Sequence, residues 1–185
     1  MKNNTLTLSN EDGQLFYELW KPLLDFVNKK YRVTNKLQNI AEGRGLDPTE
    51  VMKIADKLWS NVEVIDEYVQ DNTNLPEEHQ EIIRSWKRRI RGRFIMERHL
   101  KQGSIFISEN GEVYQVKGIT SSWDDMYFGW PMPVMVDATF IPFRNVIIPD
   151  GLMSSYNIIF GSGMKKSFKE EYMDAKKNNR IIKSL

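Results

Sequence analysis

The chain has 185 residues, of which 41% are hydrophobic, 28% charged and 11% aromatic, a composition typical of a globular protein with one full core or two small modules. It contains no cysteine, which excludes disulfides, thiolate nucleophiles and thiolate-bound metals. The net charge is +1, and the sequence shows neither a secretory signal nor an apolar run of about 18 residues, so we expect a cytoplasmic protein with no membrane partner.

The first hundred residues have the apolar spacing of helices. A first helix is expected over residues 9–31, kinked or split at Pro22. Asp47 followed by Pro48 predicts the start of a second helix, because aspartate caps helix N-termini and proline fits the first turn. Apolar residues then recur at helical spacing over 51–69, which predicts one continuous helix.

A third helix is predicted from Leu75, since its apolar positions continue as far as Phe94. The stretch 84–101 is also strongly basic, and on a helix its charges can follow a phosphate backbone. The candidate nucleic-acid-binding residues of this basic helix are Arg84, Lys87, Arg88, Arg91 and Arg98. The alternative is a solvated face, or a face that pairs with the more acidic first segment.

The apolar period changes to two near Gly103, which predicts strands. Asn110-Gly111 predicts a two-residue hairpin turn that sets Ile107 opposite Tyr114 on one face. A second turn is expected at Asp150-Gly151. This half is expected to contain five strands, a short helix and a last helix, over residues 105–108, 113–119, 121–128, 134–141, 146–148, 156–160 and 164–177.

Together these elements predict an α+β protein. A helical N-terminal half, residues 1–101, is followed over residues 102–185 by a five-stranded, mainly antiparallel sheet or small open barrel with a C-terminal helix. The pattern is compatible with two domains and with one compact unit.

The segment 133–177 contains proline-phenylalanine, paired isoleucines, aspartate-glycine-leucine, then tyrosine-asparagine-isoleucine and a glycine-rich turn into a helix. In these motifs it resembles a family of uncharacterised bacterial proteins. The resemblance covers about a quarter of the chain. It implies a bacterial protein with this fold unit, and it implies no activity and no functional residue.

The glycine-rich turn is a candidate anion site. Gly161, Ser162 and Gly163 precede a helix that bears Lys165, and free amides at a helix N-terminus beside a lysine can hold an anion. The turn lacks the glycine-lysine-serine/threonine ending of a phosphate-binding loop. The alternative is a sharp strand-to-helix turn in which Ser162 caps the helix.

Aromatic residues cluster around a short predicted helix. Trp123, Tyr127 and Trp130 lie beside Pro131, a grouping suited to a groove for a protein or peptide partner. The alternative is that these rings pack the helix onto the sheet, since aromatic side chains dominate core burial.

Carboxylates in the strand-rich half offer a route to catalysis. Asp124, Asp137 and Asp150 are candidate ligands for the divalent metal of a hydrolase. His79 and His99 are expected on one helix, about 30 Å apart, so they cannot share an intrachain site.

The sequence therefore favours a non-enzymatic binding or accessory module, without cofactor, that docks a protein or peptide partner through the aromatic stretch. A nucleic-acid-associated protein that uses the basic helix is the alternative. A metal-dependent hydrolase is the third hypothesis.

Overall fold

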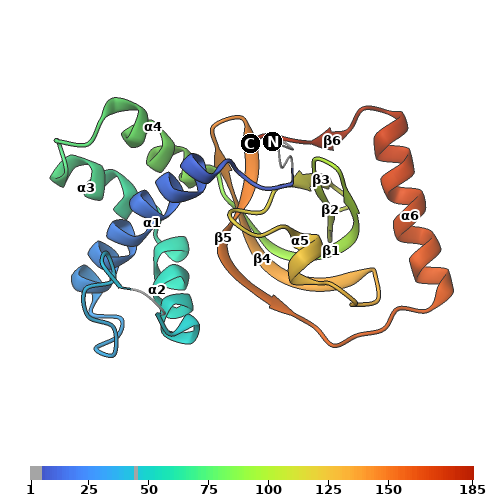
Figure 1. Ribbon diagram of the computed structural model, residues 1–185, viewed down its shortest axis with the longest axis horizontal. Coiled ribbons are helices and arrows are strands. Elements are labelled where there is room, and N and C mark those ends of the chain that lie inside the picture. Colours follow the sequence, from blue (N-terminus) through green and yellow to red (C-terminus); the bar gives the residue numbers. More distant parts are fainter. Residues whose placement is uncertain (1–5, 44–45) are drawn as a thin grey trace. The chain divides into compact units, whose positions relative to one another are not determined.

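The computed structural model describes residues 6–43 and 46–185, and these form two compact units (Figure 1). Residues 11–87 make a helical unit. Residues 88–185, joined by the described part of the first ten residues, make a barrel unit. The α+β class, the helical N-terminal half and the C-terminal helix are confirmed. Along the sequence, the boundary between the two units lies after Lys87, whereas the sequence pattern placed it after Lys101. The reason is that the strand that begins at Ile90 belongs to the barrel unit.

Within the described residues the helical unit contains four α-helices and one 3-10 turn. They are α1 (Asn10–Tyr31), α2 (Pro48–Ser60), α3 (Val64–Asp71), α4 (Glu77–Ser85) and η1 (Trp86–Arg88). Helix α1 continues through Pro22 and is not split. Helix α2 starts as predicted, because the Asp47 side chain accepts a hydrogen bond from the backbone N–H of Thr49 at 2.9 Å.

The predicted continuous helix over 51–69 is wrong, because the helix is interrupted at Asn61 and continues as a separate helix from Val64. The backbone N–H of Asn61 donates to the Leu58 carbonyl and ends α2. Its side-chain amide donates to the Tyr31 hydroxyl at 2.7 Å, which ties the break to the end of α1. A helix end that is held by a contact to α1 thus divides one apolar stripe between α2 and α3.

Four aromatic rings form the centre of the helical unit. Trp20 of α1 stacks on Trp59 of α2 with ring centroids 5.4 Å apart. Trp86 of η1 meets Trp20 edge-on at 5.6 Å and Phe16 at 5.9 Å. Rings of this size bury a large apolar area, so the cluster holds the first, second and last elements of the unit together.

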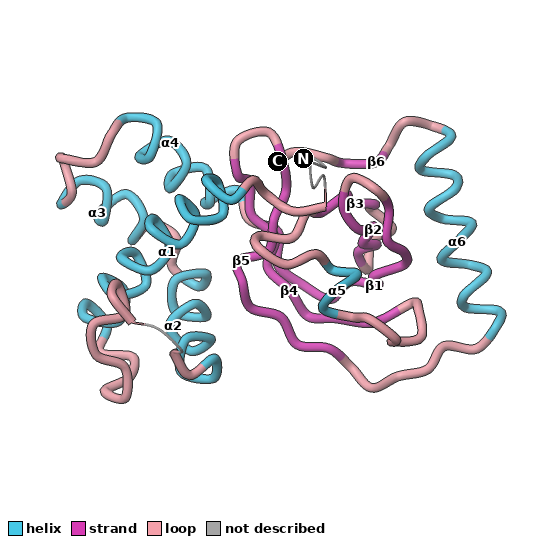
Figure 2. Tube along the Cα trace, in the orientation of Figure 1, coloured by secondary structure: helices cyan, strands magenta, loops and turns pink. Residues whose placement is uncertain are grey.

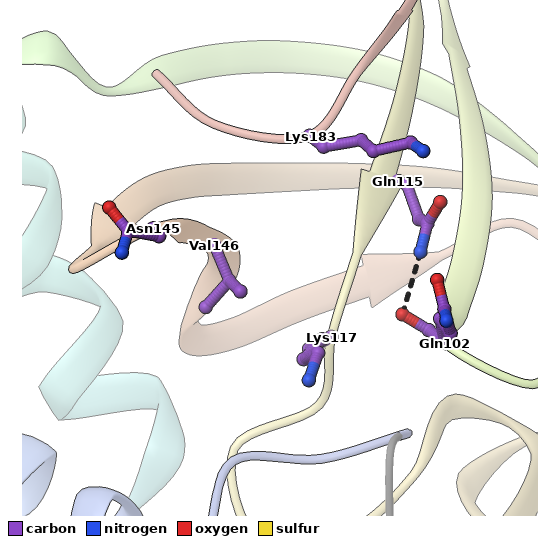
Figure 3. Close-up of a pocket in the computed structure, with 6 residues that line it drawn as sticks. All are labelled: Gln102, Gln115, Lys117, Asn145, Val146 and Lys183. Atoms are coloured by element: carbon purple, nitrogen blue, oxygen red, sulfur yellow. Dashed lines mark hydrogen bonds between the residues drawn. The ribbon is translucent and has the colours of Figure 1, made fainter.

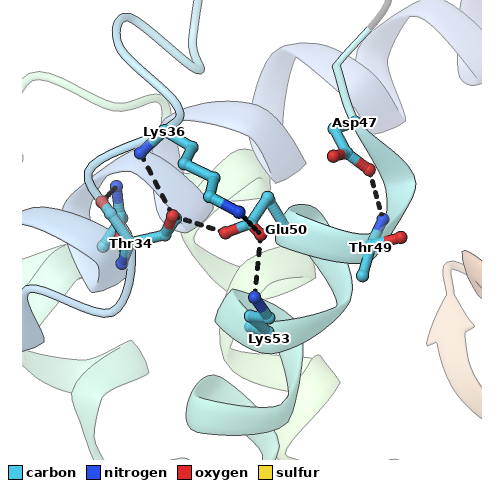
Figure 4. A network of polar contacts seen from close by, with 7 residues as sticks. Thr34, Lys36, Asp47, Thr49, Glu50 and Lys53 are labelled. Carbon is cyan, nitrogen blue, oxygen red and sulfur yellow. Dashed lines mark hydrogen bonds and ion pairs between the residues drawn. The ribbon is translucent and has the colours of Figure 1, made fainter.

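A buried carboxylate joins α2 to the loop after α1 (Figure 4). Glu50 accepts hydrogen bonds from the Thr34 hydroxyl and from Lys53, at 2.7 Å, and it pairs with Lys36 at 3.3 Å. These contacts, that of Lys53 first, lower the pKa of Glu50 to about 2. Thr34 is itself held by Asn28, whose side chain bonds both its N–H and its carbonyl. Glu50 is therefore ionised and fully partnered in the folded unit.

The barrel unit contains six strands and two helices among its described residues (Figure 2). They are β1 (Ile90–Leu100), β2 (Gly103–Ser108), β3 (Val113–Val116), α5 (Trp123–Met126), β4 (Val134–Phe143), β5 (Val146–Ser155), α6 (Ser162–Lys177) and β6 (Ile181–Ile182).

The first five strands close into a barrel. The strand order is β2-β1-β4-β5-β3-β6, and β2 also pairs with β3, which closes the ring. All pairings are antiparallel except β3 with β5 and with β6. β4 returns beside β1 after the β1-β2-β3 meander, which is the Greek-key connection. Five-stranded Greek-key barrels of this kind include the OB-fold.

The predicted third helix is wrong beyond Ser85, because residues 90–100 form β1. Trp86, Ile90 and Phe94 are four residues apart, and this spacing puts them on one side of a helix and on one side of a strand alike. Pairing decides between the two, since β1 bonds to β4 through its first part and to β2 through its second. Phe94 and Met96 point into the barrel as a result.

The hairpin between β2 and β3 forms around Asn110-Gly111, but its register differs by one residue from the prediction. Ile107 lies opposite Val113, and Phe106 lies opposite Tyr114. The Ser108 N–H donates to the Glu112 carbonyl at 2.9 Å, and Gly111 has a φ of 78°, so the turn closes between Ser108 and Glu112 and is longer than two residues. Because a one-residue shift exchanges the two faces, Phe106 and Tyr114 fill the barrel while Ile107 and Val113 face outward.

The outward apolar residues are covered by α6. Phe168, Tyr172 and Ala175 of this helix pack on a patch of the barrel that includes Ile105 and Ile107. The chain then returns as β6, which pairs in parallel with the start of β3. A helix and a sixth strand therefore cover apolar surface that a five-stranded barrel alone would leave exposed.

Asp150-Gly151 lies inside β5 and does not form the predicted turn. The β4–β5 register shifts at this point, and Gly151 has a φ of 89°. The buried Asp150 side chain accepts a hydrogen bond from the Leu152 N–H at 3.0 Å. Aspartate and glycine favour local turns, and here the turn is a bulge within a strand. The strand predicted over 156–160 is absent. β5 extends through the bulge and ends at Ser155, and residues 156–160 have no regular structure.

We predict that Gly103→Ala destabilises the barrel unit by about 1–3 kcal/mol. Gly103 has a φ of 128°, and a Cβ there would lie 2.6 Å from the Val116 carbonyl oxygen. Gly92→Ala is the matched control, since no atom lies within 4 Å of its Cβ position. Urea unfolding followed by circular dichroism measures both. Equal losses in the two variants would contradict this assignment of strain.

We also predict that Glu50→Gln lowers the stability of the helical unit at neutral pH. The depressed pKa means that the carboxylate stabilises the fold above about pH 4.5 and that this contribution is lost as the pH falls towards 2. The variant should therefore show a weaker loss of stability over that range. Thermal unfolding between pH 2 and pH 7 checks this, with the exposed Glu18→Gln as control. An unchanged pH profile would contradict it.

Candidate functional site

The basic segment 84–101 does not form the helix on which the nucleic-acid hypothesis was based. It spans the end of α4, η1 and β1. Arg84 and Lys87 belong to the helical unit, whereas Arg88, Arg91 and Arg98 belong to the barrel unit. The helical spacing that placed these charges on one stripe is therefore absent.

Several of these basic side chains have partners. Lys87 donates to Asp66 at 2.6 Å and to Glu63 at 3.0 Å, and these bonds, the one to Asp66 first, raise the pKa of Lys87. Arg98 pairs with Glu97, and its guanidinium lies 4.4 Å from the ring centroid of Tyr172. Lys87 thus pairs with the acidic first segment, as the alternative interpretation expected.

Asp137 takes part in a cluster on the barrel surface. Its carboxylate accepts from the Tyr156 hydroxyl and pairs with Arg93 at 3.3 Å. Arg93 also donates to the Tyr156 hydroxyl at 2.9 Å, and this bond is the main cause that raises the pKa of Arg93. The cluster links β1, β4 and the residue after β5, so Asp137 already has two partners.

The other two candidate metal ligands have different surroundings. Asp150 is buried in the β5 bulge, and Asp124 is exposed in α5. Across residues 6–43 and 46–185, no group of three or more histidine, aspartate or glutamate side chains is placed to hold a metal ion. No observation in this part of the chain favours a metal-dependent hydrolase.

The glycine-rich turn leads into α6, as expected. The helix begins at Ser162, and its N-cap is Gly161 rather than the predicted Ser162. No side chain caps this end, and Gly163 and Lys165 are exposed. The first turn contains no acidic residue. This end of α6 therefore presents backbone N–H groups and a positive charge to solvent.

The aromatic stretch divides into buried and exposed residues. Trp123 retains only 2% exposure, because it packs against Phe106 in the barrel core at 5.1 Å between ring centroids. It is therefore not a contact residue for a partner, and the packing alternative holds for it. Tyr127 is half-buried and meets Trp130 edge-on at 5.4 Å. Trp130 is exposed.

Large apolar side chains are exposed on two segments of the barrel unit. Phe128 is 86% exposed and Ile159 is 78% exposed. We define the apolar surface as these two residues together with Met126, Trp130, Ile158 and Met164. The second half of this surface was not predicted, because the sequence pattern over 156–160 indicated a strand.

The two segments of the apolar surface join the sheet side by side. The first segment enters β4 at Val134, and the second leaves β5 at Ser155. The Tyr156 N–H donates to the Met135 carbonyl at 2.9 Å, directly beyond the pair formed by Val136 and Ser155. Sheet pairing therefore brings together two segments that are separate in the chain.

His99 does not share a helix with His79. His79 lies on α4, whereas His99 lies on β1 at the edge of a cavity of about 420 Å³. Its Nδ1 lies 2.7 Å from the Ser104 hydroxyl, and Asp124 lines the same cavity. Burial lowers the pKa of His99, and Asp124 opposes that shift. Because the Ser104 side chain is itself buried, it orients the imidazole rather than presenting a nucleophile to a substrate.

Comparison with protein-family models, with curated proteins and with solved structures finds no match to this chain. Among the described residues, no helix is both long enough and apolar enough to cross a membrane. The function must therefore be argued from the side chains, since a barrel fold by itself supports many activities.

We predict that His99 titrates below the ordinary histidine pKa of about 6.5. Asp124→Asn should lower the pKa of His99 further, because the carboxylate favours the imidazolium form. NMR titration of the imidazole protons measures both proteins, with the exposed Glu109→Gln as control. A higher pKa of His99 in Asp124→Asn would contradict the assigned contacts.

Proposed function

We propose that this protein is a non-enzymatic binding module of the bacterial cytoplasm that holds a protein partner on the apolar surface. The proposed partner segment is amphipathic, with apolar anchors and acidic flanking side chains. The observation that carries this proposal is the exposure of Phe128 and Ile159 on neighbouring segments of a folded barrel.

Exposed apolar side chains indicate a binding site when several of them occur on neighbouring segments. Single exposed apolar residues are normal on protein surfaces, whereas grouped ones mark interaction sites. Six large apolar side chains are exposed on two segments, one before β4 and one after β5, that flank the same end of the β4–β5 pair. Aromatic and methionine side chains, which are enriched in protein interfaces, make up four of the six.

Helix α5 and the residues after it, which carry the first segment of the apolar surface, are held in place by local contacts. The Ser122 side chain caps α5 by accepting from the Asp125 N–H at 3.1 Å. Trp123 anchors α5 in the core, and the Tyr127 hydroxyl donates to the Met153 sulfur at 3.9 Å. Trp130 rests on the Tyr127 ring. Trp130, which belongs to the apolar surface, is thus already held and loses little freedom on binding, which favours affinity.

Charge beside the apolar surface supports an acidic partner. Lys165, Lys166 and Lys169 follow Met164 within the first half of α6. Lys166 pairs with Glu170, while Lys165 and Lys169 have no carboxylate partner among the described residues. The uncapped N–H groups of α6 add positive potential at the same end. Acidic side chains next to apolar anchors would complement this arrangement.

Nucleic-acid binding through the basic segment has less support. Lys87 and Arg98 are engaged with carboxylates, and the predicted helical stripe is absent. We therefore retain the protein partner as the proposed ligand class.

The test uses a designed amphipathic helix with leucines on one face and glutamates on the other. Fluorescence anisotropy should show that it binds the wild-type protein, and that a lysine-substituted version of the same peptide binds more weakly. We predict that Phe128→Ser combined with Ile159→Ser weakens binding by about tenfold or more, because apolar anchors carry most interface energy.

Met173→Ser is the matched control, since Met173 is 47% exposed on α6 and lies outside the apolar surface. Its affinity for the acidic peptide should match that of the wild type. Equal losses in the control and in the double variant, or preference for the lysine peptide, would refute the proposed surface. Self-association that the double variant abolishes would replace the peptide partner by a second copy of the chain.

A further inference from the structure

A second polar site lies on another part of the barrel unit (Figure 3). It is a cavity of about 230 Å³ on the outside of the barrel. Its lining comes from the β1–β2 turn, from β3 and the residue after it, from the β4–β5 turn and from the segment after β6. The lining residues are Gln102, Gln115, Lys117, Asn145, Val146 and Lys183.

The charged side chains that line this cavity are all positive. Among the residues that the structure describes, two lysines and three side-chain amides line it, and no carboxylate does. Lys117 and Lys183 have no ion-pair partner among residues 6–43 and 46–185. By contrast, Lys87, Arg93 and Arg98 elsewhere in the chain all pair with acidic side chains. The two lysines share one cavity without a counter-charge.

The lining is held in place by the fold. The backbone N–H of Lys117 donates to the Ile147 carbonyl at 2.9 Å, next to the β3–β5 pair that closes the barrel. Lys183 directly follows β6, which is paired with β3. The Gln115 amide donates to the Gln102 carbonyl at 2.8 Å. In the view of Figure 3 these two glutamines lie between the side chains of Lys183 and Lys117.

These groups specify the chemistry of a ligand. Lysine ammonium groups and the side-chain amides of Gln102 and Asn145 donate hydrogen bonds, which suits an anion with several acceptor oxygens. The Gln115 N–H is engaged, so its side-chain oxygen remains an acceptor for a hydroxyl or amine next to that anion. The cavity is smaller than drug-sized sites of roughly 300–1,000 Å³, so it fits one phosphate and its adjoining group.

We propose that this cavity binds a phosphate group, with Lys117 and Lys183 as its charge partners and Gln102, Gln115 and Asn145 as its polar partners. The phosphate belongs either to a small phosphorylated molecule or to the backbone of a single-stranded nucleic acid. This site is separate from the apolar surface and does not depend on the proposed protein partner.

The test combines two probes. Ribose 5-phosphate is titrated into the ¹⁵N-labelled protein and followed by NMR, and a labelled single-stranded oligonucleotide is titrated at low and physiological salt and followed by anisotropy. Lys117→Gln with Lys183→Gln removes the two charges of the cavity. Lys176→Gln with Lys177→Gln removes two exposed lysine charges on α6 and is the matched control. Circular dichroism confirms that both variants fold.

The proposal predicts that a phosphate probe shifts the amide signals of the lining residues. The cavity variant should weaken that binding by about tenfold or more, and the control should retain it. Binding of ribose 5-phosphate alone identifies a small-molecule site, whereas salt-dependent binding of the oligonucleotide at the same signals identifies a nucleic-acid backbone. Absence of shifts with both probes, or equal loss in the control, would overturn the proposal.

Discussion

The barrel unit depends on one strand that belongs to two ladders. β1 pairs with β4 through Ile90 to Met96 and with β2 through Phe94 to Leu100, and its register shifts near Glu97. A bulge bends its strand and increases the local twist, and the register shift in β1 supplies such a bend. The bend allows β2, β3, β5 and β4 to close the ring, so aromatic rings from β1, β2 and β4 meet in one core.

Closure also decides what remains outside the barrel. α6 and β6 cover the apolar patch on β2 and β3 and do not cover the two proposed sites. The pairing of β4 with β5 sets Phe128 and Ile159 on neighbouring segments. The seam between β3 and β5 sets Lys117 and Lys183 around a cavity. Both proposed sites therefore consist of residues that are distant in sequence and that only the closed barrel brings together.

The sequence was informative where a local interaction determines the structure. The Asp47 cap and the α+β class are confirmed because each rests on neighbouring residues or on a long apolar period, whereas the hairpin at Asn110-Gly111 forms in another register. The basic segment was misassigned because Ile90 and Phe94 fit a helix and a strand equally, and only pairing with β4 decides between them. Asp150-Gly151 was misassigned because a turn and a bulge need the same residues. Of the predicted contact residues, Trp130 is exposed, as a contact residue must be, and Trp123 is buried. No local sequence signal predicted that Ile158 and Ile159 would be exposed.

The central claim is that the apolar surface binds an acidic amphipathic partner. Hydrogen exchange of the intact protein, measured with and without the designed glutamate-and-leucine helix, tests it most directly. Bound peptide should slow exchange over residues 126–133 and 156–165 and leave the helical unit unchanged. Protection confined to residues 11–87, or no protection at peptide concentrations that saturate binding, would contradict it.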